Sequence, residues 1–431
     1  MVTHSLFLFA SRAALRLVAC SCAIVCSGIA GEPAAPPSAT WKFATTLGVR
    51  ETYDSNVYLQ DHAPSPAIVG AAPAQLSSLV TAVSAGVNVE SRGATGLVVT
   101  GSYAPEVVRY HSASSENYTT HRAQIAASRR AGAVAWNVSD ALVWTDGSKD
   151  SPIFGGPGGA PALGGIPLRD RRAALVNRSN FRLESVAGRW LFRALASGYW
   201  HDFRTNQLRQ SGCANYIDRS EVSAGIEGGY EFQPKTRVIA GLRLARQTQS
   251  SLFGVDSPFD STRRRFVAGL EGAPCTWLQL NLLAALETRT FAAGTPTGFD
   301  RHKRLLWIDA SATATPTKHD TLTLTVRRAE QPASTSASVY EDTAGELTWR
   351  HKCTDRVTAS AALKVWTGIW QLPAVRRDRV CTPTLQLQFT LNPHCIVEAI
   401  WSYDDATSGI PSTEGREFTR HLGGLSARYT F

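Results

Sequence analysis

Apolar and polar residues alternate in one short segment after another along most of this chain. In the segment 219–232, Val222 and Ile226 belong to one set of alternate positions, while Glu221 and Glu227 belong to the other. Successive side chains of a β-strand point to opposite faces, so this pattern predicts a strand with one apolar and one polar face. About 18 such segments follow one another, with almost no helical pattern between them. The sequence therefore predicts an all-β fold.

The connections between these segments alternate between short and long. Tight turns rich in Gly, Pro, Asn or Asp, such as Ala187-Gly188, Pro234-Lys235 and Ala273-Pro274-Cys275, alternate with longer polar stretches such as 205–218 and 292–303. This alternation predicts an antiparallel up-and-down β-barrel with short turns at one rim and long loops at the other. An even number of strands would bring both ends of the barrel to the short-turn rim. A soluble β-sandwich is the alternative, because its polar faces would simply meet bulk solvent.

The last segment, Phe418–Phe431, finishes on an aromatic residue, and its alternate positions are apolar. It resembles the final strand of bacterial outer-membrane β-barrels, in which a terminal Phe and alternating apolar residues are recognised by the barrel-assembly machinery. The resemblance implies a transmembrane barrel in outer-membrane lipid, with short periplasmic turns and longer extracellular loops. The alternative is an edge strand of a soluble sandwich. The residues predicted to form the assembly signal are Phe431, Tyr429, Ala427 and Leu425.

Aromatic residues gather at the ends of the predicted strands. Amphipathic rings favour the two interfaces of a membrane, so this distribution predicts two aromatic girdles on the lipid-facing surface. The alternative is that aromatic residues are common in any strand. The predicted girdle next to the short turns contains Trp136, Trp190, Trp277, Trp349, Tyr230, Phe232 and Tyr429, and the girdle near the long loops contains Trp144, Trp200, Trp370, Phe291 and Tyr403.

The amino-terminal residues have the pattern of a secretory signal peptide. Arg12 and Arg16 precede an apolar run, residues 17–29, that is too short to span a membrane as a helix. Small residues at the end of this run favour cleavage before Gly31, and a lipoprotein signal ending at Cys20 is the alternative. The predicted divisions of the chain are residues 1–30 as signal peptide, residues 31–40 as a short disordered lead and residues 41–431 as the barrel.

Composition argues against several other classes of protein. No later stretch reaches about 18 consecutive apolar residues, so no membrane-spanning helix is predicted. Of the 8 cysteines, those outside the signal segment form an odd and scattered set, which predicts neither a disulfide framework nor a zinc site. The formal net charge is +9, but the basic residues are dispersed and alternate with apolar ones, which argues against nucleic-acid binding. We expect no metal and no cofactor.

A barrel of this size encloses an aqueous lumen, so the polar faces of the strands are expected to line it. The sequence therefore predicts a porin-like channel for polar solutes. An excess of arginine in the lumen would favour anions, because charge lining a confined pore sets its selectivity. The residues assigned to the lumen by alternation are Arg182, Glu227, Arg237, Arg243, Glu287 and Arg327.

A short motif, Tyr53-Asp54-Ser55-Asn56-Val57-Tyr58, closes the first predicted strand. It resembles the YDSNV signature near the start of a bacterial family named putative β-barrel porin 2. The likeness extends along the chain only as hairpin spacing and in the final strand. It implies an outer-membrane barrel often associated with exopolysaccharide secretion, with no catalytic residue to carry over. A structural interpretation of Asp54 and Asn56 is that they hydrogen-bond the backbone where the strand passes into a loop.

Catalytic motifs are absent from the sequence: it contains no Gly-x-Ser-x-Gly, no His-Glu-x-x-His and no phosphate-binding loop. His201-Asp202 and His319-Asp320 are adjacent pairs, but neighbours on a strand point to opposite faces, so neither pair forms a dyad by itself. We therefore expect no enzymatic activity. Two other roles stay open: a component of a polysaccharide secretion system with periplasmic partners, or a closed scaffold or adhesin. Residues 146–170 are long enough to fold inward as a constriction.

Overall fold

The computed structural model describes residues 40–63, 73–93, 95–147, 172–204, 217–250, 259–332, 339–371, 375–409 and 417–431. They form a single antiparallel sheet of 18 strands. The strands are β1 (Thr40–Asp54), β2 (Ser78–Arg92), β3 (Leu97–Tyr110), β4 (Tyr118–Ala131), β5 (Val134–Asp146), β6 (Ala174–Ala187), β7 (Trp190–Phe203), β8 (Arg219–Gln233), β9 (Thr236–Gln249), β10 (Ser261–Cys275), β11 (Leu278–Phe291), β12 (His302–Ala314), β13 (Asp320–Pro332), β14 (Val339–Lys352), β15 (Val357–Trp370), β16 (Arg376–Asn392), β17 (Cys395–Ser408) and β18 (Phe418–Thr430). The described residues include one 3-10 turn, η1 (Ser114–Glu116), and no helix long and apolar enough to cross a membrane.

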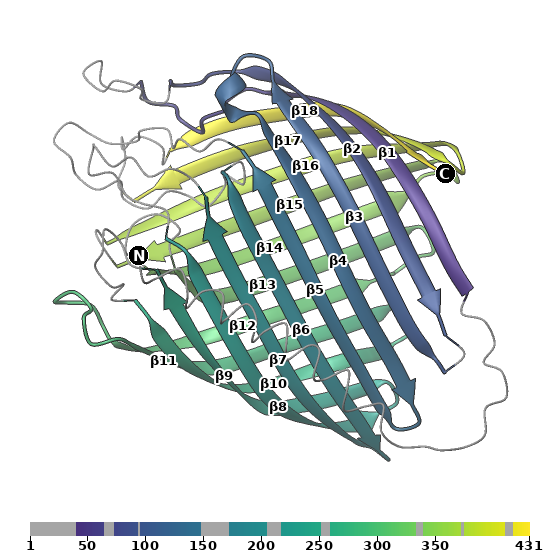
Figure 1. Cartoon of the computed structure of the whole chain (residues 1–431), viewed down its shortest axis with the longest axis vertical. Coiled ribbons are helices and arrows are strands. Elements are labelled where there is room, and N and C mark those ends of the chain that lie inside the picture. Colours follow the sequence, from purple (N-terminus) through teal and green to yellow (C-terminus); the bar gives the residue numbers. More distant parts are fainter. Residues whose placement is uncertain are drawn as a thin grey trace, which may run out of the picture. The chain divides into compact units, whose positions relative to one another are not determined.

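The sheet closes on itself between its first and last strands (Figure 1). β1 pairs with β18 from Thr46↔Thr430 to Asp54↔Leu422, and on its other side it pairs with β2. Each strand therefore has a neighbour on both sides, and closure removes the free edges that a sandwich would retain. The predicted all-β, up-and-down barrel and its number of strands are confirmed, and the sandwich alternative is wrong.

The connections also alternate in length as predicted. Short turns such as Gly132-Ala133 and Gly188-Arg189 lie at one rim, which we call the short-turn rim. Gly132 and Gly188 have φ values of +58° and +59°, a conformation that glycine adopts without steric cost. The longer connections lie at the opposite rim, which we call the long-loop rim. The start of β1 and the end of β18 both lie at the short-turn rim. Phe431, directly after β18, donates its backbone N–H to the O atom of Thr45, near the start of β1, at 2.9 Å.

Two predicted boundaries are wrong. Ala273-Pro274-Cys275 is not a turn, because β10 continues to Cys275 and the turn follows at Thr276-Trp277. The pairing of β10 with β11 shifts between Gly272 and Cys275, since Pro274 has no N–H to donate to the ladder. The first strand was expected to reach Tyr58, but β1 ends at Asp54. The predicted signal peptide, residues 31–39 of the lead and most of the predicted constriction 146–170 lie outside the described residues.

The outward face of the barrel is apolar. Ile226 and Leu286, for example, are 68% and 70% exposed, although both lie in the middle of strands. Large exposed rings lie near both rims, including Trp190 and Trp277 beside short turns and Trp144 towards the long loops. The outward face therefore matches the predicted alternation.

Two residues assigned to the girdles do not face outward. Phe291 and Trp370 are 2% and 1% exposed. Phe291 packs with Phe259 and Phe299 inside the barrel, and Trp370 stacks on Tyr340 with 4.3 Å between ring centroids. Both assignments are wrong, because these strand ends carry their rings on the inner face.

The motif at the end of β1 ties the first strand to the last. Asn56 is 1% exposed, and its Nδ2 donates to Asp61 Oδ1 at 2.7 Å and to the backbone carbonyl of Thr419 at 3.0 Å. Asp54 Oδ1 accepts from the Asn56 amide at 3.0 Å and from Arg420 Nε at 3.1 Å. Thr419 and Arg420 belong to β18, so these bonds cross the seam at which the barrel closes.

We expect Asn56→Ala to lower the free energy of unfolding by about 1–3 kcal/mol, because it leaves buried partners without hydrogen bonds. The measurement is denaturant unfolding of the folded protein in detergent micelles. Asn88→Ala is the matched control, since Asn88 is exposed on β2. Equal losses for the two variants would contradict a special role for Asn56.

Candidate functional site

A network of charged side chains covers the inner face near the short-turn rim, and Arg193 of β7 is its centre. Arg193 donates to Glu227 Oε2, Glu271 Oε2 and Glu184 Oε1, each at 2.8 Å. The three acids come from β8, β10 and β6. The side chains of Arg193 and Glu227 are 2% and 0% exposed. One guanidinium thus joins three strands of the wall.

Four of the predicted lumen residues lie in or beside this network: Arg182, Glu227, Arg237 and Arg243. Arg182 Nε donates to Glu184 Oε1 at 2.9 Å, and Arg243 Nε donates to Glu227 Oε1 at 2.7 Å. Arg237 lies 3.6 Å from Glu231. Because each of these arginines has a carboxylate partner, the network has little excess charge with which to attract an anion.

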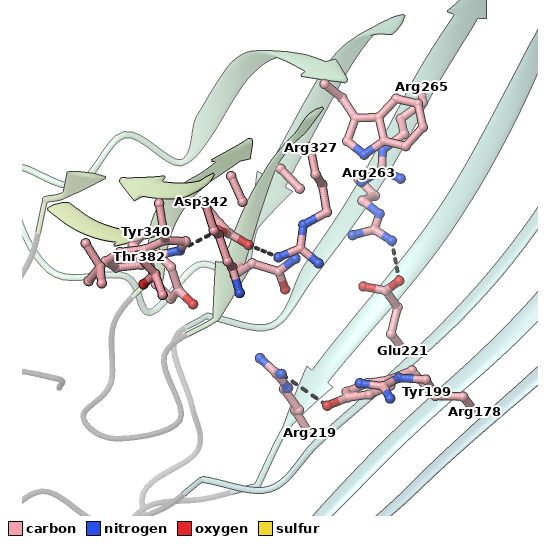
Figure 2. Close-up of a pocket in the computed structure, with 17 residues that line it drawn as sticks. Arg178, Tyr199, Arg219, Glu221, Arg263, Arg265, Arg327, Tyr340, Asp342 and Thr382 are labelled. Atoms are coloured by element: carbon pink, nitrogen blue, oxygen red, sulfur yellow. Dashed lines mark hydrogen bonds and ion pairs between the residues drawn. The ribbon is translucent and has the colours of Figure 1, made fainter. Parts of the chain in front are cut away.

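A cavity of about 600 Å³ lies on the inner face nearer the long-loop rim (Figure 2). Its two sides come from different parts of the wall, β6, β7, β8, β10 and β12 on one side and β13–β16 on the other. We call it the arginine pocket. Its cationic lining residues are Arg178, Arg219, Arg263, Arg265, Arg327 and Lys364, and its acidic lining residues are Glu221 and Asp342.

Strand register brings the first side of the pocket together. Arg178, Tyr199 and Glu221 are directly opposite one another on β6, β7 and β8, so their side chains share one face. The guanidinium carbons of Arg178 and Arg219 lie 5.2 and 5.1 Å from the centroid of the Tyr199 ring. Arg219 also donates to Tyr199 Oη at 3.1 Å. The ring of Tyr199 therefore holds two cations at the same place on the wall.

Both acids of the pocket already have an arginine partner. Glu221 pairs with Arg263, and Asp342 Oδ2 accepts from Arg327 at 2.6 Å while its Oδ1 accepts from Trp366 Nε1 at 2.7 Å. Arg265 pairs with Glu287, which is opposite it on β11.

Three cations of the pocket remain: Arg178, Arg219 and Lys364. No carboxylate among the described residues lies within ion-pair distance of them. The arginine pocket therefore carries an excess of positive charge. Anionic groups of a solute are the partners that such cations attract, through charge-assisted hydrogen bonds.

Sequence reasoning found part of this pocket. Arg327 lines it, and Glu287 is buried beside it as the partner of Arg265. Arg178, Arg219 and Lys364 were missed. Alternation could have placed Arg178 and Arg219 in the lumen. Arg178 falls in the same alternate set as Arg182, and Arg219 falls in the same set as Glu221.

The remaining predicted residues lie away from the pocket. Tyr53 is 48% exposed on the outward face. In the final strand, Leu425, Tyr429 and Phe431 are 63%, 42% and 65% exposed, and Ala427 is opposite Val49 of β1. The described residues contain no group of three or more potential metal ligands. Their four cysteines, Cys275, Cys353, Cys381 and Cys395, are free.

The two His-Asp pairs have separate partners. His201 Nδ1 lies 3.0 Å from Tyr199 Oη, whereas Asp202 pairs with Arg204. Asp320 is 2.8 Å from His351 Nδ1, not bonded to its neighbour His319. Among the described residues, His201 is not hydrogen-bonded to Asp202, and His319 is not hydrogen-bonded to Asp320 through their side chains.

Asp218, in the connection before β8, has a perturbed acidity. Its Oδ1 accepts from the Phe203 amide at 2.8 Å, and its own amide donates to Ser250 Oγ at 3.1 Å. Burial raises the pKa of Asp218 to about 6, and the nearby charge of Asp202 adds to this effect. The folded protein therefore favours the protonated acid.

The stabilising effect of the Asp218 proton is complete below about pH 4 and is lost as the pH rises through about 6. We expect the wild-type melting temperature to fall more steeply over this interval than that of Asp218→Asn. Thermal melts at a series of pH values, in the same detergent, measure the difference. Parallel pH profiles for the two proteins would show that Asp218 keeps an ordinary pKa.

No family model and no curated protein sequence matches this chain. Solved structures of similar topology include the outer membrane protein OpdK from Pseudomonas aeruginosa, with 10% identity, a TM-score of 0.42, and coverage of 90% of this chain and 99% of that one. OccK3 (OpdO) from the same organism has 10% identity, a TM-score of 0.45, and coverage of 90% and 95%. OmpT of Vibrio cholerae has 12% identity, a TM-score of 0.39, and coverage of 93% and 100%. Similarity at this level carries no information about the function of this chain.

Proposed function

We propose that this protein is a porin-like channel of the bacterial outer membrane that passes small anionic solutes. The closed sheet satisfies the hydrogen bonds of its wall internally, apart from one side of β12 beyond Ile308, and such internal pairing is what a structure spanning lipid requires. Its outward face is apolar at mid-strand positions such as Ile226 and Leu286, and these exposed side chains fit a lipid environment better than water. Outer-membrane lipid and the barrel-assembly machinery are the partners that this proposal implies, with the final strand as the assembly signal.

The observation that carries the preference for anions is the arginine pocket. Six cationic side chains and two carboxylates line it, and both carboxylates are paired. In a confined space bounded by protein, such an excess of charge attracts counter-ions and repels ions of the same sign. The pocket is therefore the proposed selectivity site of the channel.

Single-channel recording of the purified protein in a planar bilayer tests this proposal. With a salt gradient across the bilayer, we expect steady conductance steps and a reversal potential displaced towards that of the anion. Conductance with a preference for cations would overturn the anion assignment. A folded barrel that conducts no ions would overturn the channel itself and favour the secretion or scaffold roles.

A further inference from the structure

The wall of the barrel is incomplete between β12 and β13 towards the long-loop rim. Their ladder ends at the pair Ile308↔Arg328. Both strands continue beyond it, β12 outward to His302 and β13 to Pro332. On the side facing β13, the outer part of β12 has no strand partner among the described residues. β13 instead remains paired with β14 as far as Pro332↔Val339.

The end of this hairpin lies inside the barrel. We call residues Ala329–Pro332 of β13 and Val339–Asp342 of β14 the inner hairpin end. Arg219 of β8 donates to the Pro332 carbonyl at 2.9 Å, although β8 and β13 are far apart in the order of strands. Val339 packs against Phe259, Phe291 and Phe299 on the inner face. The inner hairpin end thus crosses the space in front of β8–β12, and it forms one side of the arginine pocket.

A buried ionic cluster holds the inner hairpin end in this position. Glu330 is 2% exposed, and its Oε1 accepts from Lys303 Nζ at 2.5 Å. Arg289 donates to the Glu330 carbonyl at 3.0 Å and lies 3.8 Å from its Oε2. Lys303 and Arg289 belong to β12 and β11, so the cluster joins the hairpin to the inner surface of the wall. We call these three residues the latch.

We propose that the inner hairpin end is a gate, which opens when β13 rejoins β12 and carries with it β14 and the end of β15 that is paired with β14. Continuing the observed register past Ile308↔Arg328 would place Ala329 opposite Trp307 and Glu330 opposite Leu306. Rejoining restores the ladder of the wall and removes the inner hairpin end from in front of β8–β12. The lumen is then wider at the arginine pocket.

Side-chain alternation is compatible with both positions of the hairpin. Leu306 faces outward, so Glu330 would also face outward after rejoining, while Ala329 would face inward with Trp307. On the outward face Glu330 would lie diagonally across from Arg304, within reach of a long side chain. Its carboxylate therefore exchanges the latch for another arginine rather than losing all cationic partners. Pro332 would come at the strand end, where its missing N–H costs least.

The first test breaks the latch and measures conductance in a planar bilayer. We expect Glu330→Gln and Lys303→Met each to increase the time spent in a larger conductance state several-fold. Glu106→Gln is the matched control, because it removes an acid paired with two arginines, Arg50 and Arg122, on another part of the wall. Latch variants that behave like the control would overturn the latch.

The second test traps the rejoined register with cysteines, after the native cysteines are changed to serine. Leu306→Cys with Glu330→Cys would be directly opposite only in the rejoined state, at a separation that suits a disulfide. Ala310→Cys with Val326→Cys is the positive control, since these positions are already opposite. Gel mobility after mild oxidation reports both cross-links without any use of conductance.

Only the conductance test depends on the proposed channel function. The cross-linking test reports the movement of the hairpin by itself, so the two proposals can fail separately. We expect the 306–330 cross-link to form and, in a conducting protein, to fix the larger state until a reductant is added. A cross-link that forms in a barrel without conductance would support the movement but not the channel. A 310–326 cross-link that forms while the 306–330 pair stays reduced would overturn the gate.

Discussion

Arg178→Glu combined with Arg219→Glu is expected to turn the preference for anions into a preference for cations. The two arginines flank Tyr199 in the arginine pocket and have no carboxylate partner among the described residues. At a separation of 4 Å and an effective dielectric constant of 20, two unit charges interact by roughly 4 kcal/mol. In the double variant, the two new carboxylates therefore outweigh Lys364, the one cation of the pocket that still lacks a carboxylate partner among the described residues. The sign of the reversal potential in a salt gradient is the measurement.

The control makes the same change of charge outside the pocket. Lys318 and Arg356 are exposed in connections at the short-turn rim, so Lys318→Glu with Arg356→Glu alters net charge equally. We expect this control to keep the preference for anions. If both double variants shift the reversal potential by the same amount, selectivity follows the overall charge of the protein, and the arginine pocket is not its source.

The architecture could be predicted from the sequence because it depends on local patterns. Period-two alternation, turn residues and connection lengths are each visible within about ten residues, and together they specify strand order and facing. The inward placement of Glu227 follows from the same rule, since Val222 and Ile226 occupy the other alternate set and are exposed. In a barrel with an apolar outside and a polar inside, the register of each strand is then fixed, because a shift by one residue would move all its side chains to the other face.

The pocket could not be predicted in the same way, because it depends on contacts between distant strands. Arg219 and Asp342 face each other across the lumen only because the inner hairpin end leaves the wall after Arg328. No local residue pattern at Ile308 or Arg328 marks the end of that ladder. Phe291 and Trp370 belong to the inward set of their strands, opposite to the exposed Leu286 and Leu363. The inner hairpin end covers both rings, although their positions near strand ends predicted a girdle.

Charge pairing was the other missing element. Alternation assigns a residue to the lumen, but it does not say whether a neighbour neutralises its charge. Arg243 and Arg182 were natural choices for anion selection, yet each donates to a glutamate of the network around Arg193. The inner face therefore holds two kinds of cation: arginines near the short-turn rim that are paired with acids, and Arg178, Arg219 and Lys364 of the arginine pocket, which have no carboxylate partner among the described residues.

Arg193 provides the sharpest test of that separation, and we expect Arg193→Met to lower the free energy of unfolding by about 3–5 kcal/mol. The substitution keeps a long apolar side chain but leaves Glu184, Glu227 and Glu271 without their common partner. Glu227 suffers most, because its side chain is fully buried, although Arg243 still pairs with it. Arg193→Lys should recover only part of the loss, since an ammonium group cannot reproduce the planar fork that binds both oxygens of Glu271.

Denaturant unfolding in the same detergent gives the comparison, with Arg122→Met as the matched control. Arg122 also pairs with an inner-face acid, Glu106, but its side chain is 52% exposed, so its loss should cost no more than about 1 kcal/mol. Arg193→Met should leave the sign of ion selectivity unchanged in the molecules that remain folded, because the arginine pocket is intact. A variant as stable as wild type would show that the three acids find other partners. A variant with normal stability but reversed selectivity would move the selectivity site from the arginine pocket to this network.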